Sequence, residues 1–173
     1  MKKLFLPLLP AVLLAAALVA CERDGEPISD SQLPKAANFT LSTVDGSKKM
    51  SLSDFSGKPV VLNFWATWCA PCKEEIPLFE STWKEYKDKG VVFIGVDVMD
   101  DRKNAEKYVE AEGVTYINLH DPSGDASGKY GVVALPATFF IDRDGRIVHQ
   151  NYGPFVGEDG EKKFKKHLAE ITK

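Results

Sequence analysis

The sequence predicts an α/β domain in which a mixed β-sheet carries helices on its faces. Two near-continuous apolar runs, residues 60–65 and 91–96, have the length and composition of strands buried on both faces. A helix-compatible segment follows each run, and two hairpin-like pairs flank this core. The order hairpin, strand, helix, strand, helix, hairpin, helix indicates parallel strands extended by antiparallel ones.

Turn residues define the two hairpins. Asp45-Gly46 lies within the first, which predicts an N-terminal β-hairpin extension, and residues 142–145 lie within the second. The hairpin strands are expected at residues 39–41, 50–52, 137–141 and 146–151.

Helical spacing of apolar side chains predicts three helices. The first covers residues 73–89, and Pro77 should kink it. A second helix is predicted at residues 103–112, followed by a short strand or extended link at 116–119. The last helix runs roughly from residue 158 to 171.

The N-terminal residues have the plan of an export signal. Lys2 and Lys3 precede an uncharged apolar run, residues 4–20, which is shorter than the about 20 residues of a membrane-spanning helix. The run ends in Leu18-Val19-Ala20-Cys21, which resembles a bacterial lipobox. We therefore expect Cys21 to become the lipid-modified first residue of the mature chain. A soluble secreted protein and an uncleaved N-terminal anchor are the alternatives.

These signals divide the chain of 173 residues into three parts. We expect residues 1–20 to be a signal peptide, 21–37 a lipid-anchored polar tether, and 38–173 the folded domain. An ordered N-terminal extension is the alternative to a tether. Residues 1–20 hold two lysines and no acid, so their loss changes the net charge from −3 to −5. That charge argues against nucleic acid as a partner.

Cys69 and Cys72 carry the chemistry. They lie two residues apart, between the apolar run at 60–65 and the first predicted helix. This arrangement puts Cys69 at a helix N-terminus, where free backbone N–H groups and the helix dipole stabilise a thiolate. Thiolates exchange with disulfides. We therefore expect Cys69 to attack a disulfide and Cys72, one turn further on, to resolve the mixed disulfide.

Other uses of the cysteine pair are weaker. An inert structural disulfide is one alternative. A structural zinc site needs four ligands, but the chain has no second CxxC, and we expect His120, His149 and His167 to be scattered. We predict no metal site. No glycine-rich nucleotide fingerprint is present either, so the redox group should be the Cys69–Cys72 disulfide itself, without a cofactor.

The two residues between the cysteines set the redox poise. A cation or histidine there would stabilise the Cys69 thiolate and make the protein oxidising. Ala70 and Pro71 supply neither a charge nor a side-chain donor. The sequence therefore predicts a reductant rather than an oxidant.

A family resemblance rests on the residues around this pair. Residues 61–77, VLNFWATWCAPCKEEIP, with residues 135–142, LPATFFID, and Asp144-Gly145, resemble the thioredoxin superfamily. Within it, they resemble the TlpA/ResA-like branch of membrane-tethered bacterial thiol–disulfide oxidoreductases, which is related to DsbE and CcmG. The resemblance covers roughly residues 33–173 and implies a thioredoxin fold.

The resemblance also implies roles for individual residues. Pro136 matches the cis-proline that lies against the CxxC, and the backbone at Leu135 would pair with an extended substrate. A trans-proline at the start of a strand is the alternative. Independently of the resemblance, Trp68 is adjacent to Cys69, so we expect it to offer a contact surface for a partner. With Ala70 and Pro71, these residues form the expected substrate-contact set.

Asn63 departs from thioredoxin, which carries a buried acid at this position. Asparagine cannot titrate, so proton transfer to Cys72 needs another group. Glu75, three residues after Cys72 and on the same helical face, matches the active-site glutamate of ResA-like proteins. A solvated helix glutamate is the alternative interpretation. Glu74 should point elsewhere.

The implied location and partners follow from the same branch. The protein would act on the extracytoplasmic (periplasmic) side of the membrane, with a membrane thiol protein as electron donor. An oxidised protein, such as apocytochrome c or another dithiol protein, would be the acceptor. Two alternatives are a thiol peroxidase, whose Pro-x-x-x-Thr-x-x-Cys pattern is absent here, and a copper-delivery protein using the cysteines and His120. The latter class typically spaces its cysteines by three residues.

Overall fold

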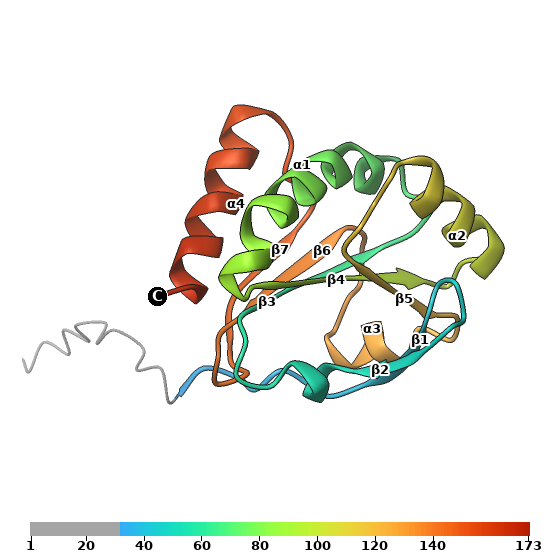
Figure 1. Ribbon diagram of the computed structural model, residues 1–173. Helices are drawn as coiled ribbons and strands as arrows, with labels where there is room; N and C mark the ends of the chain where they lie inside the picture. Colours follow the sequence, from blue (N-terminus) through green and yellow to red (C-terminus); the bar gives the residue numbers. More distant parts are fainter. Residues whose placement is uncertain (1–31) are drawn as a thin grey trace, which may run out of the picture.

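The computed structural model describes residues 32–173, which form a seven-stranded mixed sheet with helices on both faces (Figure 1). The strand order is β2-β1-β5-β4-β3-β6-β7. The strands are β1 (Thr40–Thr43), β2 (Lys49–Ser51), β3 (Val60–Trp65), β4 (Val92–Val98), β5 (Ile117–Asp121), β6 (Ala137–Ile141) and β7 (Ile147–Tyr152). The predicted fold class, a thioredoxin fold with an N-terminal β-hairpin, is confirmed.

Four α-helices within residues 32–173 cover the sheet. They are α1 (Ala70–Tyr86), α2 (Arg102–Ala111), α3 (Asp125–Lys129) and α4 (Gly157–Ile171), and short 3₁₀ turns occupy Leu52–Phe55 and Lys87–Lys89. In Figure 1, α1 and α4 lie on one side of the sheet and α3 lies on the other. The five-residue helix α3 was not predicted, because it is too short to show helical periodicity.

The strand β3 is buried on both faces, as its apolar composition predicts. Its alternate side chains enter different cores. Leu62 and Phe64 pack in a cluster with Tyr130, beside α3, whereas Val61 packs with Phe79 of α1 and Phe164 of α4. This alternation fixes which face of β3 each side chain occupies.

The register of β3 brings two distant segments to one edge of the sheet. β3 pairs in parallel with β4 and antiparallel with β6. In the antiparallel pair, Phe64 lies opposite Ala137. The end of β3 therefore lies beside the start of β6, so the residues that follow Trp65 and the residues that precede Ala137 meet at this edge.

The helix α1 begins earlier than the predicted residue 73. Cys69 is its N-cap, and its Sγ accepts a hydrogen bond from the Cys72 N–H at 3.3 Å. Pro71 lies in the first turn, where a missing N–H costs nothing. Pro77 lies inside α1, which continues to Tyr86.

The predicted signal peptide, Cys21 and most of the predicted tether lie outside the described residues. The last part of that tether runs beside the second hairpin: Pro34 O accepts from Ile147 N–H at 2.8 Å, and Ala36 N–H donates to Gly145 O at 2.9 Å. None of the helices in residues 32–173 has the length and apolar content needed to span a bilayer.

Candidate active site around the Cys69–Cys72 disulfide

Cys69 and Cys72 form a disulfide at the N-terminus of α1, with an S–S distance of 1.98 Å and a Cα–Cα distance of 5.3 Å. Cys72 has no exposed surface, whereas Cys69 is 5% exposed. Of the two residues, Cys69 is thus the one that keeps surface open to an incoming group. Its contact with the Cys72 N–H is the kind of interaction that stabilises a thiolate once the disulfide is reduced.

The predicted substrate-contact residues surround this disulfide. Trp68 is 62% exposed, and Ala70 and Pro71 are also exposed. Leu135 packs against the cluster that contains both cysteines, and the Leu135–Pro136 peptide bond is cis, as the resemblance implied. The structure therefore places all five residues around one edge of the sheet.

Glu75 is fully buried on α1, one turn after Cys72, whereas Glu74 is exposed. Its Oε1 accepts from Asn63 Nδ2 at 2.8 Å, and its Oε2 accepts from the Phe155 N–H at 3.0 Å. Burial raises the pKa of Glu75 to about 7, against the opposing effect of these two hydrogen bonds. A carboxyl group with this pKa can both take and release a proton near neutral pH.

The Asn63 amide can serve both protonation states of Glu75. Its Nδ2 donates to Glu75 and also to Thr138 Oγ1 at 3.1 Å, while its Oδ1 is buried without a hydrogen-bond partner among the described residues. A carboxylate needs a donor, and a carboxylic acid needs an acceptor. A half-turn rotation of the Asn63 side-chain amide would turn Oδ1 toward protonated Glu75, where it can accept a hydrogen bond. Asparagine can therefore hydrogen-bond to Glu75 in either protonation state.

A second network holds the loop that leads to Cys69. Asp100 Oδ2 accepts from both the backbone N–H and the hydroxyl of Thr67, each at 2.6 Å. Behind it, Asp97 is fully buried at the end of β4 and its Oδ2 lies 2.8 Å from Nδ1 of His120. Burial, with the charge of Asp100, raises the pKa of Asp97 to about 8. The loop is therefore tied to the end of β4.

The sequence did not reveal several of these partners. The Phe155 N–H lies 80 residues from Glu75, Thr138 lies 75 residues from Asn63, and Asp100 lies 33 residues from Thr67. These contacts arise from sheet register and helix packing. A backbone N–H group such as that of Phe155 cannot be recognised in a sequence as a hydrogen-bond donor to a particular side chain. Asp100 and Asp101, which lie just past the end of the buried strand β4, give only a weak indication that they take part in the site.

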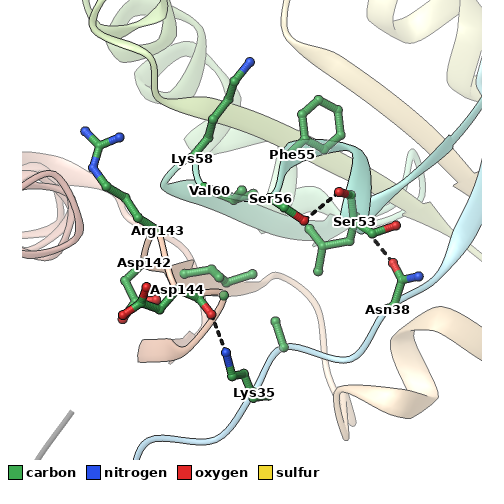
Figure 2. A pocket seen from close by; sticks show the side chains of 15 residues that line it. Lys35, Asn38, Ser53, Phe55, Ser56, Lys58, Val60, Asp142, Arg143 and Asp144 are labelled. Atoms are coloured by element: carbon green, nitrogen blue, oxygen red, sulfur yellow. Dashed lines mark hydrogen bonds between the residues drawn. The ribbon is translucent and has the colours of Figure 1, made fainter. Parts of the chain in front are cut away.

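A surface pocket of about 200 Å³ lies elsewhere. Figure 2 shows the Lys35 ammonium, at one side of this pocket, donating a hydrogen bond to the carbonyl of Asp144, at 2.6 Å. Its lining includes Val60, the first residue of β3, whereas the disulfide follows the last residue of that strand. This pocket is therefore separate from the dithiol, and the redox chemistry belongs to the exposed edge around Trp68.

Comparison with known proteins agrees with this geometry. The model of the AhpC/TSA family matches residues 34–150. The thiol-disulfide oxidoreductase ResA of Bacillus thuringiensis subsp. konkukian is 35% identical over 138 residues, which are 80% of this chain and 77% of that protein. ResA of Geobacillus thermodenitrificans is 37% identical over 136 residues, 79% of this chain and 75% of that protein.

Solved structures give the same result. A thiol:disulfide interchange protein of the thioredoxin family from Chlorobium tepidum superposes with a TM-score of 0.73 at 26% identity, covering 84% of this chain and 100% of that one. A secreted Mycobacterium tuberculosis disulfide oxidoreductase homologous to E. coli DsbE gives 0.68 at 26% identity, covering 77% and 96%. The chain therefore belongs to the AhpC/TSA family of the thioredoxin superfamily, and it is a thiol-disulfide oxidoreductase of the ResA/DsbE type.

Proposed function

We propose that this oxidoreductase is a reductant of protein disulfides, tethered to the extracytoplasmic side of the membrane by a lipid on Cys21. The observation that carries the direction of electron flow is the pair Ala70-Pro71. These exposed residues place no charge and no side-chain donor between the two sulfurs. Without such a group the reduced form gains little extra stability, and the dithiol is a good electron donor.

The proposed reaction uses the two cysteines in sequence. The Cys69 thiolate attacks one sulfur of the substrate disulfide, which forms a mixed disulfide and releases the other substrate sulfur as a thiolate. Glu75 then takes the proton of the Cys72 thiol, and the Cys72 sulfur attacks Cys69. The Cys69–Cys72 disulfide forms and the second substrate thiolate leaves, so two electrons pass to the substrate. No further cofactor is required.

Partners of matching chemistry follow from this reaction. The acceptor is an oxidised protein thiol pair, such as that of apocytochrome c or another dithiol protein. The donor is a membrane thiol protein, which reverses the steps and reduces Cys69–Cys72 again. Exposed Trp68 and half-buried Leu135 offer the apolar surface on which either partner would dock.

The midpoint potential tests the proposed direction. Equilibration of the oxidised protein with glutathione, read by alkylation of free thiols, should give a value nearer thioredoxin, about −270 mV, than DsbA, about −120 mV. The physical reason is the uncharged Ala70-Pro71 pair. A midpoint close to that of DsbA would reject the reductant assignment.

The lipid anchor has its own test. In cells, Cys21→Ala should either leave the signal peptide uncleaved or release the mature protein from the membrane fraction, because Cys21 is the proposed acylation site. Stable attachment needs two or more acyl chains. The isolated domain should keep wild-type dithiol chemistry. Mature Cys21→Ala protein that stays in the membrane fraction would contradict the anchor.

A further inference from the structure

Two histidines and a glutamate converge where β7 packs against α4. His149 lies on β7, while His167 and Glu170 lie three residues apart on α4 and share a face of that helix. One potential ligand atom from each residue lies within 4.8 Å of the other two. The expectation that all three histidines are scattered is wrong for this pair, since the rings of His149 and His167 have centroids 4.1 Å apart.

The side chains of the cluster are half-buried, and one of their nitrogen atoms has no hydrogen-bond partner among the described residues. The side chains of His149 and Glu170 are 30% and 28% exposed, and Nε2 of His149 contacts Oε2 of Glu170. Nδ1 of His167 is buried and makes no hydrogen bond within residues 32–173. A buried polar atom without a partner is uncommon and costs free energy, which indicates an additional water or ion.

We propose that His149, His167 and Glu170 form a binding site for a divalent transition-metal ion of the Zn²⁺ class. Two imidazole nitrogens and one carboxylate oxygen match the donors of His₂Glu zinc sites, in which a fourth position remains open to water. Imidazole favours zinc, copper and nickel, whereas calcium and magnesium favour all-oxygen sites. Ligands about 2.0–2.2 Å from zinc in a tetrahedron lie about 3.4 Å apart. Ion binding would bring the three ligand atoms, which now lie within 4.8 Å of one another, to that spacing.

The site is distinct from the dithiol. His149 pairs with Phe140 of β6, which pairs with Val61 near the start of β3, whereas the cysteines follow the end of β3. The bound ion would join the edge strand β7 to the C-terminal helix. Lys163 and Lys166 lie near enough to act electrostatically on His167, so they oppose a cation and limit the affinity.

The test is a zinc titration of the full chain, with Cys69–Cys72 oxidised and any free thiol at Cys21 blocked by alkylation. These conditions remove thiolates, which bind zinc strongly. Calorimetry should show one saturable ion per chain. His149→Ala and Glu170→Gln should each raise the dissociation constant for zinc at least tenfold. His120→Gln and Glu158→Gln, which change the same residue types outside the cluster, should leave it unchanged.

A second measurement does not depend on the variants folding. Histidine ring signals in the NMR spectrum of the wild type should shift for His149 and His167 as zinc is added, and those of His120 should not. Magnesium at the same concentration should shift neither. Absence of saturable binding, equal affinities in the cluster and control variants, or shifts confined to His120 would each overturn the proposal.

Discussion

Replacing Cys72 with serine should turn a transient mixed disulfide into a stable product. In Cys72→Ser the Cys69 thiolate still attacks a substrate disulfide, but no second sulfur remains to displace the substrate. The covalent complex should accumulate with an oxidised model protein and should be visible on non-reducing gels and by mass spectrometry. A dithiol reductant should dissolve it.

The matched variant is Cys69→Ser, in which the remaining thiol is Cys72. Cys72 has no exposed surface and lies one turn inside α1, so its sulfur is inaccessible to a protein disulfide. We expect almost no trapped complex. Efficient trapping by Cys69→Ser, with little by Cys72→Ser, would reverse the two roles.

Glu75→Gln should slow the resolving step and leave the first attack largely intact. Glutamine cannot accept the Cys72 proton, and general acid–base catalysis is typically worth about 10²- to 10⁴-fold in rate. We expect a loss of about 10² in the resolution rate at pH 7, measured by stopped-flow after the mixed disulfide is preformed. Glu74→Gln is the control, because Glu74 is exposed on the same helix. Equal resolution rates in both variants and the wild type would remove Glu75 from the mechanism.

The same substitution should change how stability depends on pH. The pKa of Glu75 is raised from 4.5 in the unfolded chain to about 7 in the folded protein, chiefly by burial. The folded state therefore holds the proton more tightly. Protonated Glu75 therefore makes its full contribution to the free energy of unfolding below pH 4.5. That contribution, about 3 kcal/mol, is lost as the pH rises to about 7.

Denaturant unfolding of the oxidised protein between pH 4.5 and pH 8 measures this effect. The wild type should lose stability across that interval relative to Glu75→Gln, which has no proton to lose. The difference between the two proteins isolates Glu75 from other titrating groups. Parallel pH profiles would contradict a raised pKa at this position.

Sequence patterns predicted the elements that have strong local signals. The apolar runs that became β3 and β4, the hairpin at Asp45-Gly46 and the C-terminal helix all have them. The start of α1 was predicted three residues late, because Cys69 acts as an N-cap although cysteine is not a favoured capping residue. The helix α3 was missed because five residues cannot show a period.

The site was predictable only in part. The CxxC and the Leu-Pro before β6 are marked in the sequence, and Glu75 follows from helical spacing. The surroundings that set the pKa of Glu75 are not marked, because Asn63 and the Phe155 N–H reach it from other elements. The pairing of His149 with His167 depends likewise on how α4 packs against β7.

The antiparallel pairing of Phe64 with Ala137 makes the geometry of the active site insensitive to insertions and deletions in distant loops. Backbone pairing between β3 and β6 places Pro136 at the same edge of the sheet as the disulfide. The position of Pro136 relative to the cysteines therefore does not depend on the length of the chain between the two strands. Insertions or deletions in the loop between α2 and β5, which carries none of the site residues, can therefore alter the outer surface while the two halves of the site keep their alignment.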